Sequence, residues 1–410
     1  MAGKKLCNAL FIYWLILVVW QNNGDYVGSG NLALAIKLVL VLFLTVKFSQ
    51  RSLAVRSPKL VIWLLFAIYM VVSLVVHGGG ESSAIIFYLF PVIFTLLTFI
   101  FQENAEVDEN SYFNFLRAVI VVVSYMAIYS LLFKTSYFAN LFHLTSTYGN
   151  ELSSFLVSSH EYGMYLVFGI ISCVLCFAKA SSTKMRVLYI IVILVFSLNL
   201  LATLSRTSIL ALVVFGLTFF LLSGKNRAKK YIVAAIIVFL AACILIPEVR
   251  SFTLTVVFKE SNDAGRVIMW NGSIEHFKNA SIVDQLFGMG NSETAEYVAT
   301  TFGHGAVHNA FIQVLLVLGV SGEIWLVGCI ISSLINGIRI RKIDKNYGAL
   351  FIALTVSAIS FLFTNTACIM ESPIDSFMLT IFTITIPYYV SNSIYHNGME
   401  SKYSETHIHW

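Results

Sequence analysis

The sequence predicts an all-α integral membrane protein with about 12 transmembrane helices. Of its 410 residues, 58% are hydrophobic and only 11% are charged, and the mean hydropathy is +0.83. Apolar runs of about 17 to 25 residues, long enough to cross about 30 Å of hydrocarbon, recur along the whole chain. Because lipid offers the backbone no hydrogen-bond partner, these runs are expected to be helical.

The apolar runs divide the chain almost evenly. We predict spans at residues 6–20, 32–48, 60–76, 84–101, 116–133, 162–178, 187–203, 208–222, 231–246, 309–338, 347–364 and 377–394. The first run is short but lacks a small-residue cleavage site, so we expect a retained helix and not a removed signal peptide. Residues 1–410 are thus expected to form a single polytopic membrane domain with two long loops, at 134–161 and 247–308.

Lysine and arginine gather in alternate loops. The basic clusters lie at residues 4–5, 47–59, 179–186, 225–230 and 339–345. By the positive-inside rule both termini lie in the cytoplasm, and the two long loops lie on the opposite side. Topology and contact with anionic lipids account for these clusters, so the net charge of +5 gives no indication of nucleic-acid binding.

The two long loops are candidates for function. Loops beyond about 12 to 15 residues are usually functional or disordered, and neither of these has a low-complexity composition. In the loop at 247–308 a turn is predicted at Gly288-Met289-Gly290. A helix is predicted before it by apolar residues at helical spacing: Val267, Trp270, Ile274 and Phe277.

Two arginines lie where topology does not require a cation. Arg206 falls between two predicted spans at the outer membrane face, and Arg266 lies in the loop at 247–308. A guanidinium at membrane depth is costly unless it has an anionic partner. The alternatives are that Arg206 reaches lipid headgroups and that Arg266 is a solvated surface residue.

A pair of histidines precedes the predicted span at 309–338. His308 lies beside Asn309 at the expected helix N-terminus, where the helix dipole disfavours a protonated imidazole and favours a neutral general base. His304 is four residues earlier, and such a pair can bind a divalent metal. Gly303 and Gly305 argue against a rigid helix there, so we expect no metal. The alternative for His308 is a structural histidine with satisfied hydrogen bonds.

Four motifs occur in order between residues 205 and 322. They are Ser205-Arg206-Thr207, Gly265-Arg266-x-x-x-Trp270, Gly288-x-Gly290, and His308-Asn309 followed by Gly319-x-x-Gly322. In order and spacing this set resembles the O-antigen polymerase and ligase superfamily of polytopic membrane glycosyltransferases. The resemblance implies a fold similar to C-type glycosyltransferases, in the bacterial cytoplasmic membrane, with an active site that faces outward.

The resemblance also implies a chemistry. The family's donors are oligosaccharides on undecaprenyl pyrophosphate, and transfer needs no nucleotide sugar, metal or other cofactor. Arg206 and Arg266 would bind the pyrophosphate, and His308 corresponds to the family's catalytic histidine. Direct displacement at the anomeric carbon would invert its configuration. Further partners that the resemblance implies are membrane lipids and a chain-length-determining co-polymerase.

One region departs from the family's pattern. Many members carry an arginine and a Pro-Asn or similar pair in the earlier outward loop. In this chain the corresponding stretch, residues 147–163, has His160 and Glu161 but no lysine or arginine. We count His160, Glu161, His304 and Asn309 as candidate substrate contacts. For Glu161 the alternative is an acid that stabilises a helix N-terminus through the helix dipole.

The acceptor is the open question. A polymerase joins lipid-linked repeat units, whereas a ligase or a protein O-oligosaccharyltransferase passes the same donor to another acceptor. We predict a polymerase of O-antigen or capsule, because such genes are numerous and varied. A transporter or flippase for lipid-linked sugars is the alternative from another class, but transporters usually carry polar or helix-breaking residues in both halves.

Overall fold

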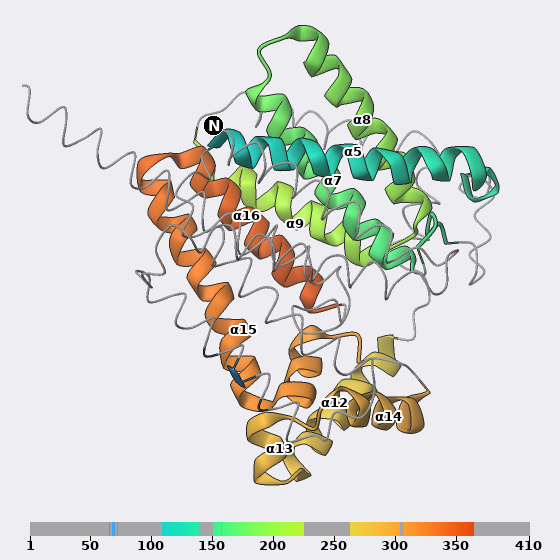
Figure 1. Ribbon diagram of the computed structural model, residues 1–410, viewed down its shortest axis with the longest axis vertical. Coiled ribbons are helices and arrows are strands. Elements are labelled where there is room, and N and C mark those ends of the chain that lie inside the picture. The colour runs from blue at the N-terminus through green and yellow to red at the C-terminus, as the bar shows by residue number, and fades with distance from the viewer. Residues whose placement is uncertain are drawn as a thin grey trace, which may run out of the picture. The chain divides into compact units, whose positions relative to one another are not determined.

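All regular elements in the described part of the chain are α-helices (Figure 1). The computed structural model describes residues 65, 68, 69, 72, 109–138, 151–156, 158–224, 263–303 and 307–364. Five of the helices there are long and apolar enough to cross a membrane, and a shorter apolar helix accompanies them. The prediction of an all-α, multi-pass membrane protein is therefore confirmed for these residues.

Six predicted spans coincide with described helices. These are α5 (Glu109–Phe133), α7 (Ser159–Lys179), α8 (Thr183–Ala202), α9 (Arg206–Leu222), α15 (Ala310–Ile343) and α16 (Lys345–Leu362). The predicted spans at 6–20, 32–48, 84–101, 231–246 and 377–394 lie outside the described residues, and only four residues of the span at 60–76 are described. The total of about 12 spans stays a prediction.

The chain divides into two compact units, which we treat separately. One consists of Met1–Lys37 and Val107–Glu260, and we call it the Arg206 unit; the other consists of Leu38–Glu106 and Ser261–Trp410, and we call it the His308 unit. The Arg206 unit contains α5, α7, α8 and α9. Besides α15 and α16, the His308 unit contains three helices from the long loop: α12 (Asp263–Asn279), α13 (Ile282–Phe287) and α14 (Asn291–Phe302).

Helix α7 is the centre of the Arg206 unit and packs against α5, α8 and α9. Tyr162 is fully buried and donates a hydrogen bond to Asn199 Oδ1 on α8 at 2.8 Å, while Ser130 Oγ on α5 donates to Tyr162 Oη at 3.2 Å. Interhelical hydrogen bonds of this kind are worth about 0.6 kcal/mol each in a membrane protein. The three-residue network therefore specifies which helix faces meet more than it stabilises the unit.

One end of the Arg206 unit brings five chain segments together. The N–H of Leu152 donates to the Ala202 carbonyl at 3.1 Å, at the end of α8. Ser154 Oγ donates to the Met126 carbonyl of α5 at 3.0 Å. Residues 151–156 thus connect the end of α8 with α5, on the side where α7 and α9 begin. This is the side that the charge pattern predicts to be extracytoplasmic.

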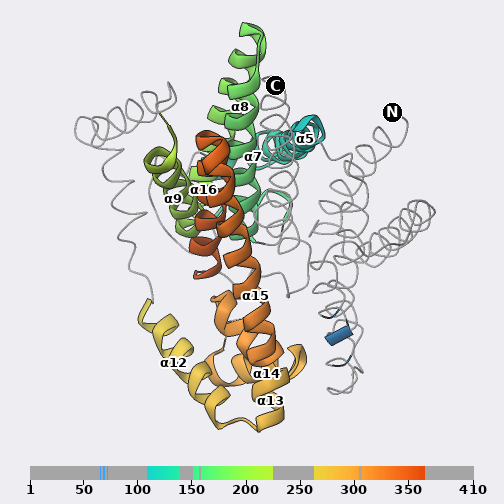
Figure 2. The ribbon, with the colours of Figure 1, turned by 90° about the vertical axis from the view of Figure 1, so that its left-hand side faces the viewer.

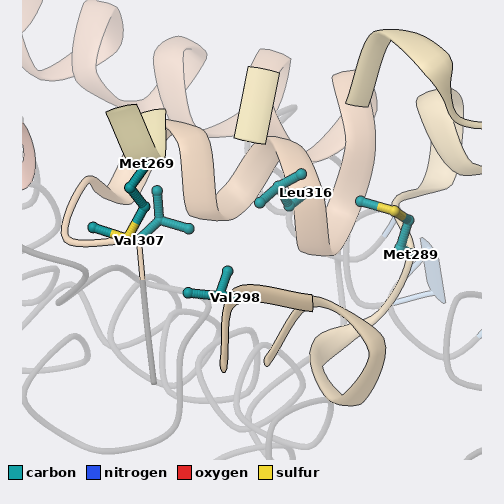
Figure 3. Close-up of a cluster of buried hydrophobic side chains, with 5 residues drawn as sticks. All are labelled: Met269, Met289, Val298, Val307 and Leu316. Atoms are coloured by element: carbon teal, nitrogen blue, oxygen red, sulfur yellow. The ribbon is translucent and has the colours of Figure 1, made fainter. Parts of the chain in front are cut away.

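The described residues of the long loop form a hydrophobic core together with the start of α15. Helix α12 confirms the helix that was predicted here. Its residues Trp270 and Phe277 pack against a buried apolar cluster. The predicted turn at Gly288 and Gly290 is also confirmed, because both residues have positive φ, of 84° and 80°. Figure 3 shows the side chains of the cluster, which point toward one another: Met269, Met289, Val298, Val307 and Leu316.

Helix α15 is interrupted within its 34 residues. Gly319 has φ 66° and ψ −167°, which is not helical. A Cβ on Gly322 would lie 3.3 Å from Val314 Cγ1, whereas residues eight apart in a straight helix are separated by about 12 Å along the axis. Residues 310–318 therefore fold back against the segment that follows. This places Leu316 in the core of the loop and leaves residues 320–343, about 36 Å of helix, to cross the membrane.

Helices α15 and α16 run side by side in both views (Figures 1 and 2). Asp344 ends α15 and caps α16, because its Oδ1 accepts from the N–H groups of Asn346 and Tyr347 at 2.8 Å and 3.0 Å. At the other end of α16 the rings of Phe311 and Phe363 lie 4.8 Å apart. The residues just before α15 therefore lie near the end of α16, at the side opposite the basic cluster at 339–345.

Candidate functional site

Arg206 is the first residue of α9. Ser205 caps this helix, and its Oγ accepts from the N–H of Ser208 at 3.4 Å. The residue before the cap, Leu204, has φ 52°, a left-handed conformation that is uncommon for a bulky residue. Arg206 is partly exposed and has no hydrogen bond or ion pair with another described residue. A guanidinium and a helix N-terminus at one position both attract an anion.

The cap of α9 is bound to the first turn of α7. His160 Nδ1 lies 3.0 Å from Ser205 Oγ, and Ser205 Oγ lies 2.9 Å from Ser208 Oγ. Both serines are fully buried. A Cβ on Gly163 would meet the Ser208 side chain, so glycine is required for α7 to approach α9 this closely. The structure thus brings His160 beside the residue that precedes Arg206.

Glu161, the neighbour of His160, lies in the first turn of α7. An acid at this position interacts favourably with the helix dipole, which is the alternative that the sequence left open. A second acid, Glu151, accepts a hydrogen bond from Ser159 Oγ at 2.7 Å, also at the start of α7. The Arg206 unit therefore has both charge signs at one end, with carboxylates at the start of α7 and a guanidinium at the start of α9.

Arg266 and Trp270 lie one turn apart on α12. Arg266 is partly exposed and has no hydrogen bond or ion pair with another residue of the described part. Trp270 Nε1 donates to the carbonyl of Val307 at 2.9 Å. This bond connects the helix that carries Arg266 to the residue directly before His308. Within the His308 unit, the structure thus links two of the predicted site motifs.

His308 lies just outside α15 and not within its first turn. Asn309 is the cap, and its Oδ1 accepts from the N–H groups of Phe311 and Ile312 at 3.0 Å and 3.2 Å. Asn309 is only 4% exposed, so capping accounts for its side chain and leaves little surface for a substrate. The predicted effect of the helix dipole on His308 is correspondingly weaker, because that effect falls off beyond the first turn.

The backbone of His308 is strained. Its φ is 54°, and a residue other than glycine in this left-handed region costs about 1 to 3 kcal/mol. The flanking residues hold it there: Val307 accepts from Trp270 and its N–H donates to Gln313 Oε1 at 3.4 Å, while Asn309 caps α15. Strain of this kind is found mostly at functional sites. His308 is partly exposed despite these fixed neighbours.

Three carbonyl groups next to the break in α15 accept hydrogen bonds from other segments. The Met289 N–H donates to Leu316 at 2.8 Å and the Gly290 N–H donates to Val317 at 3.2 Å. Tyr69 Oη donates to the Leu318 carbonyl at 2.5 Å. Irregular backbone in a membrane protein is tolerated where the protein itself satisfies it, as here.

The glycines of the motifs allow this arrangement sterically. A Cβ on Gly288 would collide with the backbone of Val317, and one on Gly319 would lie 2.6 Å from backbone atoms of Leu286. Both residues also have positive φ. The Gly288-x-Gly290 and Gly319-x-x-Gly322 motifs therefore shape the segment that follows His308.

Several contacts could not be read from the sequence. The bond from Tyr69 to Leu318 joins residues that are 249 positions apart, and Tyr69 belongs to no motif. Ser205 and Trp270 stand within motifs, but nothing local indicates that they bind His160 and Val307. His304 lies outside the described residues, so the metal-binding alternative is not tested.

Comparison with known families finds a match, which covers part of the chain. Residues 190–327 match the family described as O-antigen ligase. This match confirms the resemblance to the O-antigen polymerase and ligase superfamily, and it spans Arg206, Arg266 and His308 together. In a comparison with curated proteins, none matches the chain.

Proposed function

We propose that the protein polymerises undecaprenyl-pyrophosphate-linked oligosaccharide repeat units into a surface polysaccharide at the outer face of the cytoplasmic membrane. One observation carries the proposal. A single family-matched stretch holds Arg206 and Arg266, which have no partner among the described residues, and His308, whose strained backbone is fixed on both sides. An O-antigen ligase or a protein O-oligosaccharyltransferase would use the same residues on the same donor.

The reaction is a displacement at the anomeric carbon of the donor. A hydroxyl of the acceptor sugar attacks this carbon, its proton passes to the imidazole of His308, and the bond from the carbon to the pyrophosphate oxygen breaks. The electron pair leaves with the lipid pyrophosphate. Attack opposite the leaving group inverts the anomeric configuration. A positioned general base of this kind contributes about 10²–10⁴ to the rate.

The arginines stabilise the leaving group. Pyrophosphate carries more negative charge after the bond breaks than before, so a cation bound to it lowers the barrier. Arginine remains charged and offers two parallel N–H donors that match the phosphate oxygens. At Arg206 the N-terminus of α9 adds a favourable field. This displacement needs no metal ion or other cofactor.

The choice of acceptor separates the proposal from its closest alternative. The matched family is described as O-antigen ligase, and the match fits both activities. A ligase transfers a finished chain to a different acceptor. Polymerisation instead requires a second lipid-linked repeat unit as acceptor, with membrane lipid around both. A chain-length-determining co-polymerase would then be a further partner. Both activities share the donor chemistry and differ only in the product.

Deletion of the gene tests this choice directly, with the surface polysaccharide resolved on a gel. The polymerase proposal predicts that single repeat units remain where the wild-type strain makes a ladder. Full-length polymer that stays on its lipid carrier would instead identify a ligase. Unchanged polysaccharide would contradict both, and complementation with the intact gene controls for effects on neighbouring genes.

A further inference from the structure

His160 was predicted as a candidate substrate contact, but its ring contacts a residue that caps a helix. Its Nδ1 lies 3.0 Å from Ser205 Oγ, which caps the helix that begins with Arg206. The two residues are 45 positions apart and belong to different helices, α7 and α9. The contact therefore links the start of one helix to the start of another.

These contacts use the hydrogen-bonding capacity of the Ser205 hydroxyl fully. It has one proton, and three groups surround its oxygen: the N–H of Ser208, the hydroxyl of Ser208 and Nδ1 of His160. Its own N–H donates to Thr203 Oγ1 at 3.2 Å. Ser205 is fully buried, and a buried polar group that loses a hydrogen-bond partner is costly. Loss of the imidazole would leave this cap without one of its partners.

The first turn of α9 depends on that cap. Leu204 holds the chain in a left-handed conformation, which persists only where surrounding contacts enforce it. Arg206 follows the cap directly, and a cation at the first residue of a helix is opposed by the dipole. Without a fixed cap the first turn is free to fray, and the guanidinium moves with it. The direction of the Arg206 side chain thus depends on the contact between His160 and Ser205.

We propose that His160 is a positioning residue, which fixes Arg206 for its anionic ligand through the hydroxyl of Ser205. This inference rests on the proposed function, in which that ligand is the pyrophosphate of a lipid-linked oligosaccharide. His160 acts through Nδ1 and does not itself contact the sugar. In the stretch where many family members carry an arginine, His160 would thus contribute to the donor site indirectly.

Two substitutions separate this role from a substrate contact. The side-chain amide of asparagine lies as many bonds from Cβ as Nδ1 does, whereas that of glutamine reaches the position of Nε2. His160→Gln should therefore lower kcat/KM for the lipid-pyrophosphate donor on the order of tenfold. His160→Asn should recover most of that loss. The reverse order, with glutamine active and asparagine inactive, would assign a contact to Nε2 and overturn the proposal.

A double-mutant cycle tests whether the effect passes through Arg206. If His160 only positions Arg206, His160→Gln should change donor kcat/KM by less than about twofold when Arg206 is already alanine. A further tenfold loss in that background would mean that His160 acts on the substrate independently, and the proposal would be wrong. Membrane abundance and thermal stability of each variant separate misfolding from mispositioning.

The control variant is Gly216→Ala on α9, the helix that begins with Arg206. A Cβ at Gly216 meets nothing within 4 Å, so this change should leave turnover unaltered. Absence of donor cleavage by the wild-type protein would contradict the proposed function itself. Wild-type turnover that depends on Arg206 but not on His160 would contradict the positioning role alone.

Discussion

The two units hold their candidate groups by different kinds of interaction. In the Arg206 unit the cation follows a buried polar cluster, in which an imidazole and two serine hydroxyls meet at the ends of α7 and α9. In the His308 unit the imidazole is held through its backbone, by the indole of Trp270, the cap at Asn309 and a core of apolar side chains.

The difference follows from where each group lies. Helix ends close to lipid have few water molecules to satisfy them, so polar groups from neighbouring helices must do so. A long loop can instead bury apolar side chains against each other, as in the cluster of Figure 3. A polar cluster is sensitive to the direction of each donor, whereas a packed core is sensitive to volume. Substitutions that keep direction or volume should therefore behave differently in the two units.

The largest effect is expected for the general base. His308→Ala removes the proton acceptor and should lower turnover by about 10²–10⁴, while the protein remains abundant in the membrane and still binds the donor. His304→Ala should remain substantially active, because His308 acts as the base without His304. If both variants are inactive, and a chelator also inhibits until metal is restored, the two histidines bind a metal and the mechanism is wrong.

The arginines come next. Arg206→Lys and Arg266→Lys keep the charge but lose the paired N–H donors, so each should reduce donor kcat/KM by about 10- to 100-fold. Ionic-strength dependence of the same rates provides the check. Full activity in the lysine variants would show that only a positive charge is needed, and that neither guanidinium binds the pyrophosphate through paired hydrogen bonds.

A matched glycine pair on α15 tests the fold-back at Gly319. Alanine favours a helix over glycine by about 1 kcal/mol, so Gly328→Ala, where a Cβ meets nothing within 4 Å, should be neutral or stabilising. Gly322→Ala introduces the same methyl group against Leu318 and Val314, and should lower stability by about 1 to 3 kcal/mol. Thermal unfolding in detergent measures both. Equal behaviour of the pair would mean that residues 310–318 do not pack against the second segment.

The smallest effect is expected for Trp270→Phe. This change keeps an aromatic ring in the core but removes the donor to Val307, and a hydrogen bond of this kind contributes about 0.5 to 1.5 kcal/mol. Turnover should fall about three- to tenfold, and the loss of thermal stability should not exceed the contribution of this one bond. Unaltered turnover would show that the indole bond does not hold His308 in its strained conformation.

The helices were predictable because apolar length and composition determine them locally. The boundaries of α7, α9 and α16 fall within three residues of those predicted, and the periodicity of Val267, Trp270, Ile274 and Phe277 identified α12. The break in α15 was not foreseen, because Gly319 stands in an apolar run that a continuous helix explains equally well. It depends on donors from Met289, Gly290 and Tyr69, which sequence spacing cannot bring together.

The site was predictable as a set of residue types and not as a set of contacts. Arg206 stood out because a cation lay where topology required none. His308 stood out because it was expected at a helix N-terminus and because a family motif contains it. The strained φ of His308 and the contact between His160 and Ser205 arise from packing between distant segments. Asn309 stays a candidate substrate contact, and the sequence alone did not show that its side chain caps α15.

All the proposed residue roles depend on cleavage of a lipid pyrophosphate by this chain, which can be measured as turnover by the purified protein. Reconstituted in liposomes with an undecaprenyl-pyrophosphate-linked oligosaccharide, the wild-type protein should release one undecaprenyl pyrophosphate for each glycosidic bond formed, with inverted anomeric configuration, and His308→Ala should release almost none. Oligosaccharide that crosses the bilayer with its pyrophosphate bond intact would instead identify a transporter, and would contradict the account.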